Sequence, residues 1–187
     1  MLTQDQRKTL LQIARESIAA LLDGKRPDLN GYVLDDDLRR PAGVFVTLND
    51  RTGELRGCIG SIEPVAPLYE SISRSAINAA FRDPRFYPVT KDELPSLHFE
   101  ISVMGPITPV RDIAEIEVGR DGLIISRAPY AGLLLPQVAT EYGWDRETFL
   151  SQTCVKAGLP SSAWRSGDAR IERFSAEVFG EQTAEHA

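Results

Sequence analysis

The residues best suited to chemistry lie in one segment, Leu55-Arg56-Gly57-Cys58-Ile59-Gly60. It holds one of the two cysteines of the chain, with an arginine two positions before it. Side chains alternate between the two faces of a β-strand, so Arg56 and Cys58 are expected to share a face. A nearby guanidinium favours the thiolate, which is the reactive form of cysteine. The pattern predicts a functional thiol or a pocket, and a buried structural cysteine is an equal alternative.

Two further features bear on this thiol. Strand interiors usually avoid glycine, so Gly57 and Gly60 indicate a bulge, a bend or the close approach of another group. His98 lies on the polar side of an alternating run, Leu97 to Val103. A Cys58–His98 dyad would require that this strand lie beside the thiol strand, and an exposed strand histidine is the favoured alternative.

Metal and cofactor motifs are scarce. The only histidines are His98 and His186, and no Cys-x-x-Cys pair occurs, so no metal site is predicted. Neither a phosphate-binding P-loop nor a dinucleotide-binding glycine turn is present, and no cofactor is predicted. The acidic run at residues 35–37 is interpreted as a solvated turn rather than a cation site.

The elements that must position Cys58 follow from periodicity and from turn residues. Residues 43–48 and 54–60 predict a hairpin whose second arm carries the thiol. Helical spacing predicts helices over residues 4–23 and 67–81 and another after Asp145, on which Cys154 belongs to the core. Residues 25–41 are expected to form a loop. Further strands are expected at 97–103, 123–126, 133–135 and 170–179, with Phe174, Ala176 and Val178 on one face of the last.

Length and composition limit the class of protein. The chain has 187 residues, 42% hydrophobic and 26% charged, and a formal net charge of −6. This charge argues against a nucleic-acid binder that relies on a broad basic surface. No signal-peptide pattern and no membrane-spanning apolar run is found, so a cytoplasmic protein with two free thiols is expected. Two interlocked α+β subdomains are expected within a single domain, residues 1–187, with a disordered tail at 180–187.

The ordered motifs of the chain resemble the AMMECR domain family, named after the candidate protein for the human AMME syndrome. The signature run is Leu55 to Gly60, and the likeness spans nearly the whole chain. The other matching segments are Gly43-Val44-Phe45-Val46-Thr47-Leu48, Ala79-Ala80-Phe81-Arg82-Asp83-Pro84-Arg85-Phe86, Gly132-Leu133-Leu134-Leu135-Pro136-Gln137 and Cys154-Val155-Lys156-Ala157-Gly158-Leu159.

This resemblance implies an α+β fold of two subdomains, with a mainly antiparallel or mixed sheet and the signature facing a cleft. It also implies component A of the AmmeMemoRadiSam set, with a Memo-like protein and a radical SAM enzyme as partners. Cys58 and Arg56 are then candidate catalytic residues. The candidate binding residues are Gly57, Gly60, Arg82, Asp83, Arg85 and Gln137. For Arg82 and Asp83 the alternative is a local ion pair that secures the turn at Pro84, and for Gln137 it is a polar contact at a helix start.

Three functions remain open at this point. The first is a binding component that holds a small molecule or a partner segment in the cleft around residues 55–60. The second is an enzyme with Cys58 as nucleophile, for which the sequence offers no clear base. The third is RNA or nucleotide modification, which requires Arg56, Arg74, Arg82 and Arg85 to converge into a local basic patch.

Overall fold

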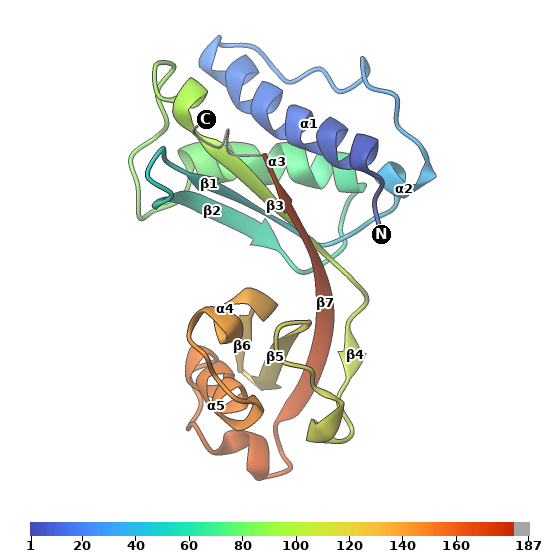
Figure 1. The fold of residues 1–187 in the computed structure, drawn as a ribbon, viewed down its shortest axis with the longest axis vertical. Coiled ribbons are helices and arrows are strands. Elements are labelled where there is room, and N and C mark those ends of the chain that lie inside the picture. Colours follow the sequence, from blue (N-terminus) through green and yellow to red (C-terminus); the bar gives the residue numbers. More distant parts are fainter. Residues whose placement is uncertain (182–187) are drawn as a thin grey trace, which may run out of the picture. The chain divides into compact units, whose positions relative to one another are not determined.

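The computed structural model describes residues 1–181 and divides them into two compact units (Figure 1). Unit 1 comprises residues 1–104 and the segment that starts at Glu177, and unit 2 comprises Gly105–Ala176. The chain therefore leaves unit 1 after its first hundred residues and returns at its end. Both units combine helices with antiparallel strands, which confirms the predicted α+β class.

Unit 1 is a sheet with two long helices on one face (Figure 1). The helices are α1 (Gln4–Leu22) and α3 (Leu68–Phe81). The strands are β1 (Val44–Asn49), β2 (Leu55–Ser61) and β3 (His98–Met104), in the order β2-β1-β3, and the end of β7 (Arg170–Gly180) lies next to β3. The predicted hairpin is confirmed as β1–β2, and β2 is the edge strand.

Helix α1 begins with the predicted capping box, in which Thr3 and Gln6 each bond the other's backbone N–H. It ends at Leu22, before Gly24 with its positive φ of 71°. The loop predicted for residues 25–41 contains a short helix, α2 (Asp36–Arg39). Asp35 caps α2 by accepting a hydrogen bond from the Leu38 N–H, which explains part of the acidic run.

The core of unit 1 follows the predicted strand periodicity. Val44, Val46 and Leu48 of β1 point inward, as do Phe99 and Ile101 of β3. Helix α3 presents three small residues to the sheet, Ala76, Ala79 and Ala80. Their small size lets the backbone of α3 approach β2 closely. A short 3-10 helix, Leu94–Ser96, closes the loop between α3 and β3.

Unit 2 has its own core around the pair β5 (Asp121–Arg127) and β6 (Tyr130–Leu134). β5 also pairs with β7, and the two-residue strand β4 (Thr108–Pro109) pairs with β7 too. The helices are α4 (Pro136–Glu141) and α5 (Arg146–Lys156), with 3-10 turns at Ile113–Glu115 and Ala163–Arg165. Cys154 lies fully buried on α5 beside Phe149 and Leu150, so its predicted place in the core is confirmed.

Two expectations at the end of the chain are corrected. Phe174 of β7 is buried, but Val178 is 36% exposed and Phe179 is buried instead, because β7 joins the core of unit 1 after Ala176. The predicted tail at 180–187 begins too early, because Gly180 ends β7 and Glu181 accepts hydrogen bonds from Arg15. Residues 182–187 of that tail lie outside the described residues.

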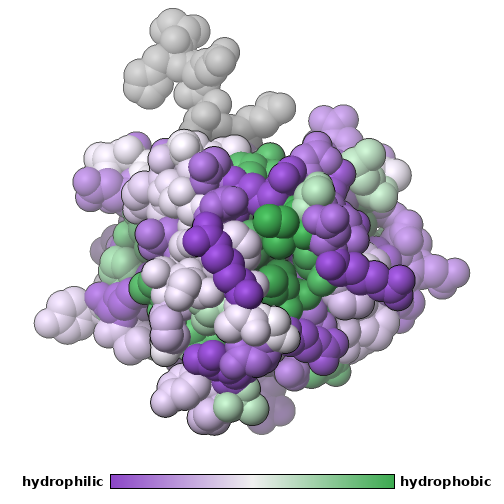
Figure 2. All heavy atoms as spheres, turned by 90° about the horizontal axis from the view of Figure 1, so that it is seen from below, coloured by the Kyte–Doolittle hydropathy of each residue, from purple (hydrophilic) through white to green (hydrophobic). Residues whose placement is uncertain are grey.

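The surface is mixed in character. On the face shown in Figure 2, hydrophilic residues surround a smaller group of hydrophobic ones. None of the helices within residues 1–181 has the length and apolar character needed to cross a membrane. Over the same residues, no three side chains of His, Cys, Asp or Glu gather in a group able to hold a metal ion.

Candidate functional site

The signature segment forms β2 at the edge of the sheet of unit 1. Its register with β1 places Cys58 opposite Thr47 and Gly60 opposite Phe45. The register shifts near the start of β2, where Gly57 lies opposite Leu48 but Leu55 lies opposite Asn49. Arg56 is therefore the extra residue of a β-bulge, which interrupts the regular alternation of side chains.

Both signature glycines are explained by the close approach of backbone from this chain. A Cβ atom at position 57 would lie 2.3 Å from the carbonyl oxygen of Ala79 on α3. A Cβ atom at position 60 would lie 2.1 Å from the Val44 carbonyl oxygen in β1. These glycines therefore allow the hairpin and α3 to pack together, and Gly60 also borders a pocket described below.

Cys58 is partly exposed, and its polar groups have partners. Its Sγ atom accepts a hydrogen bond from Thr47 Oγ1 at 3.2 Å. Its N–H donates to Asp83 Oδ2 at 2.9 Å, and its carbonyl oxygen accepts from Arg85 Nη2 at 3.3 Å. The edge of β2 is thus covered at this residue by a carboxylate and a guanidinium, which is one way in which proteins protect an open strand.

Asp83 and Arg85 form a two-pronged ion pair beside Cys58. Arg85 Nε and Nη2 donate to the two carboxylate oxygens of Asp83 at 2.9 Å and 2.7 Å. Arg85, together with the N–H groups of Cys58 and Arg85, holds the pKa of the buried Asp83 well below its ordinary value, although burial acts in the opposite direction. An ion pair at this turn was expected as the alternative role of Arg82 and Asp83, but the partner of Asp83 is Arg85, and Arg82 makes no ion pair within residues 1–181. The Asp83–Arg85 pair secures β2 as well as the turn at Pro84.

Arg56 contacts the loop after α3. Its Nε atom donates to Glu93 Oε1 at 2.5 Å, and its Nη2 donates to the Tyr87 carbonyl oxygen at 2.9 Å. This interaction lowers the pKa of Glu93. The expected support of the Cys58 thiolate by Arg56 is therefore replaced by an ion pair with Glu93, and the arginine that contacts Cys58 is Arg85.

The possible dyad of Cys58 and His98 does not form, because β1 lies between their strands. His98 is paired with Asn49, whereas the β3 residue in the row of Cys58 and Thr47 is Glu100. Two interstrand spacings separate Cys58 from β3, which is about 10 Å. His98 is a strand residue, as the alternative interpretation stated, but it is half-buried rather than exposed.

The remaining predicted residues lie elsewhere. Arg82 is the C-cap of α3 and its exposed side chain borders a second concavity. Gln137 lies in unit 2, at the second position of α4, and its Oε1 atom is buried without a hydrogen-bond partner in the described part of the chain. Of the four arginines of the third function, Arg56 and Arg85 are held by Glu93 and Asp83, and Arg74 and Arg82 border the second concavity.

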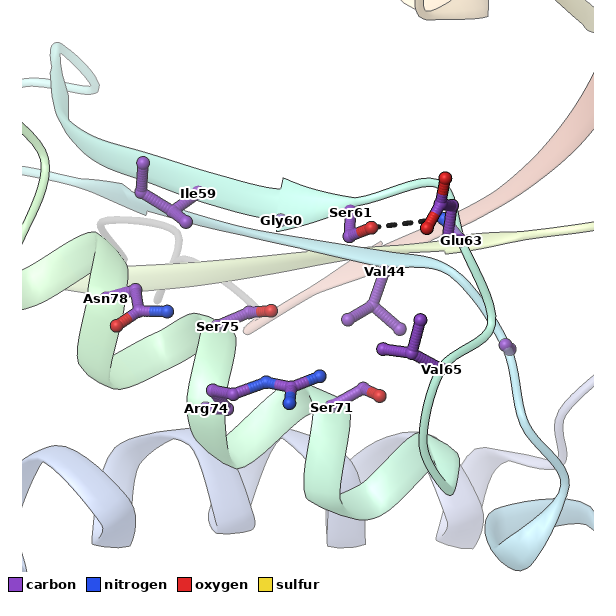
Figure 3. A pocket seen from close by; sticks show the side chains of 11 residues that line it. Val44, Ile59, Gly60, Ser61, Glu63, Val65, Ser71, Arg74, Ser75 and Asn78 are labelled. Carbon is purple, nitrogen blue, oxygen red and sulfur yellow. Dashed lines mark hydrogen bonds between the residues drawn. The ribbon is translucent and has the colours of Figure 1, made fainter.

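A pocket of about 220 Å³ lies between the end of β2 and α3 (Figure 3). Ile59, Gly60 and Ser61 form its strand side. The α3 side is polar, and in Figure 3 the side chain of Arg74 extends from the helix toward Val65. The α3 residues that border it are Ser71, Arg74, Ser75 and Asn78. The signature segment therefore borders a polar pocket, and sequence reasoning found Arg74 but missed Thr47, Ser75, Asn78 and Glu93.

The comparisons with known proteins bear on this whole arrangement. A protein-family model described as AMMECR1 matches residues 11–179. The chain belongs to the AMMECR1 family. A protein of Methanothermobacter thermautotrophicus is 47% identical over 186 residues, which cover 96% of each chain. A protein of Methanocaldococcus jannaschii is 42% identical, over 97% of this chain and 92% of the other.

A solved structure shows the same fold. The crystal structure of an uncharacterised protein of Pyrococcus horikoshii is 41% identical, with a TM-score of 0.85. The match covers 95% of this chain and 92% of the other. The segment at β2 therefore belongs to a fold that extends over nearly the whole of both proteins.

The chemistry available around Cys58 is limited. Within residues 1–181, the hydrogen bond to its sulfur comes from a hydroxyl, and neither histidine imidazole nor lysine is paired with it. A nucleophilic thiol needs an adjacent base or a strongly depressed pKa. The strand edge, the pocket and the polar α3 residues lie together, an arrangement able to bind a peptide segment or a small molecule.

Proposed function

We propose that this AMMECR1-family protein is a binding component, which holds a partner segment or a small molecule at the pocket between β2 and α3. The observation that carries the proposal is the position of that pocket against Gly60 and Ser61 of the signature strand. At about 220 Å³ it is smaller than typical drug-sized sites of about 300–1,000 Å³. Its size suits one side chain of a bound segment or a fragment-sized molecule.

The strand edge supports recognition of a peptide segment. Cys58 directs its N–H and C=O away from β1, toward Asp83 and Arg85. Opposite residues of an antiparallel pair alternate between hydrogen-bonded and non-bonded positions, so Gly60 also directs its backbone groups to the edge. A segment that lies along Gly60 would bond these groups and place a side chain in the pocket.

The partners that we propose are a Memo-like protein and a radical SAM enzyme of the AmmeMemoRadiSam set. Support comes from the AMMECR1 family membership and from the absence of a base paired with Cys58 in residues 1–181. The test is co-expression with each component, followed by size-exclusion chromatography at micromolar concentration, with and without S-adenosylmethionine. Failure of both components to co-elute under both conditions would overturn the proposal.

A matched pair of variants locates the contact. Val65 is 62% exposed and borders the pocket, whereas Val33 is 93% exposed and lies outside it. We expect Val65→Asp to weaken co-elution at least about tenfold, equivalent to about 1.4 kcal/mol, because it places a charge at the mouth of the pocket. Val33→Asp should leave co-elution unchanged. Equal effects of the two variants would show that the contact lies elsewhere.

Catalysis by Cys58 remains a second candidate, favoured by one observation. Cys58 is partly exposed, and its sulfur accepts a hydrogen bond from the Thr47 hydroxyl. Labelling of the two cysteines, described in the Discussion, tests whether this thiol is activated.

A further inference from the structure

A second concavity of unit 1 gathers positive charge on an acidic protein. It measures about 640 Å³ and lies along the outer side of α3, where it shares Arg74 and Asn78 with the smaller pocket. Arg26, Arg74 and Arg82 border it, and Glu70 is its one acidic residue among those described. Because the whole chain carries a net charge of −6, this concavity reverses the overall sign locally.

The three arginines are free to bind a ligand. Within residues 1–181, none of their guanidinium groups makes an ion pair or a hydrogen bond, whereas Arg56 and Arg85 are held by carboxylates. Arg74 lies on α3 and Arg82 is the C-cap of that helix, eight residues later, so these two exposed residues are about 12 Å apart along the helix axis and border the same concavity. Asn78 lies midway between them, and Arg26 comes from the loop after α1.

Apolar side chains form one part of the lining of the concavity. Leu29 and Tyr69 pack against the core of unit 1 and also border the concavity, and Ile77 of α3 is half-buried beside them. Cations beside apolar side chains match a ligand that has an anionic end and a flat apolar end. Arginine binds phosphate oxygens in a forked geometry, and the volume lies within the range of small-molecule sites.

We propose that this concavity, named the α3 groove, binds a phosphate-bearing small molecule of the nucleotide class. The phosphates would lie across Arg74, Asn78 and Arg82, with Arg26 closing the site, and the base would lie on Leu29 and Tyr69. This inference goes beyond the proposed function, because it concerns a different concavity and needs no protein partner. A groove bordered by three arginines favours a small ligand over an extended nucleic acid, which needs many phosphate contacts.

The experiment is calorimetric titration of the full chain with ADP, pyrophosphate and adenosine as separate probes. We expect ADP to bind, pyrophosphate to bind more weakly because it lacks the base, and adenosine to bind least because it lacks phosphate. Absence of ADP binding at millimolar concentration would overturn the proposal. Tighter binding of a single-stranded RNA oligonucleotide than of ADP, with a steep salt dependence, would also overturn it in favour of a nucleic-acid site.

Variants separate the α3 groove from general charge attraction. Arg74→Gln and Arg82→Gln should each weaken ADP binding at least about tenfold. The control is Arg51→Gln, because Arg51 is exposed in the hairpin turn, has no ion pair in the described residues and lies outside the α3 groove. Melting temperatures should match wild type in all three, since the replaced side chains are exposed. Equal weakening by Arg51→Gln would overturn the assignment to the α3 groove.

Discussion

At the scale of single residues, the signature segment is held by charged groups that lie far from it in the sequence. Cys58 is fixed through its backbone by Asp83 and Arg85, and Arg56 is fixed through its side chain by Glu93. The side chain of Asp83 is only 1% exposed, so its carboxylate is the most protected of these groups. Because Asp83 is both charged and buried, we expect its replacement to lower the free energy of unfolding more than replacement of the other charged groups around the signature segment.

Replacement of Asp83 by Asn should lower the free energy of unfolding by about 1–3 kcal/mol at neutral pH, because the Arg85 guanidinium loses its partner. Arg85 depresses the pKa of Asp83 in the folded state, so this stabilisation is complete above the unfolded-state pKa of about 3.9 and is lost as the pH falls toward the folded-state pKa. The difference between wild type and variant should therefore shrink by about 1 kcal/mol per pH unit below about pH 3.9. Urea denaturation over a pH series measures it, and a difference that stays constant down to about pH 3 would contradict it.

The two thiols should differ in reactivity. Burial raises the pKa of Cys154, whereas Cys58 is partly exposed, so iodoacetamide should label Cys58 first. Thr47→Val should slow the labelling of Cys58 several-fold, because the variant removes the hydrogen bond to the sulfur. Arg56→Ala serves as the control and should leave the rate unchanged, since Arg56 is bound to Glu93. Peptide mass mapping measures the labelling rate of each cysteine. Earlier labelling of Cys154, or an equal slowing of Cys58 labelling by Arg56→Ala and Thr47→Val, would contradict this prediction.

At the scale of elements, close packing of β2 against α3 determines where the pocket lies. Periodicity predicted the β1–β2 hairpin and α3 because these patterns depend on neighbouring residues along the chain. It did not predict the bulge at Arg56 or the insertion of β1 between Cys58 and His98. Strand order and bulges depend on contacts between distant segments. The alternation rule alone therefore predicted that Arg56 lies beside the Cys58 thiol, whereas its partner in the structure is Glu93.

This packing makes Gly57 intolerant of a side chain. Gly57→Ala should lower the free energy of unfolding by about 1–3 kcal/mol, because its Cβ would lie 2.3 Å from the Ala79 carbonyl oxygen and force the helix away. Gly31→Ala is the matched control, since a Cβ at position 31 meets nothing within 4 Å. Urea denaturation of both variants provides the measurement. A neutral result for Gly57→Ala would show that α3 moves freely over β2.

At the scale of the whole molecule, composition predicted the general class but concealed the distribution of charge. A net charge of −6 argued against a broad basic surface, yet three arginines that make no ion pair within residues 1–181 border one concavity of unit 1. Arg74 and Arg82 are recognisable from their spacing on a helix, but Arg26 joins them from a loop. Neither the net charge nor the spacing of residues along a helix shows which loop folds back beside that helix. The sequence therefore predicted Arg74 and Arg82 of the concavity but not Arg26.

The return of β7 to unit 1 has a consequence for biosynthesis. Glu177 accepts hydrogen bonds from the Leu2 N–H and from Arg7, and Glu181 accepts them from Arg15, so the first helix is held by residues that leave the ribosome late. Unit 2 is continuous in the chain, and all of its residues emerge before Glu177. A nascent chain therefore exposes α1 without these two acidic partners until its last segment is released, and the second unit is free to fold before the first is complete.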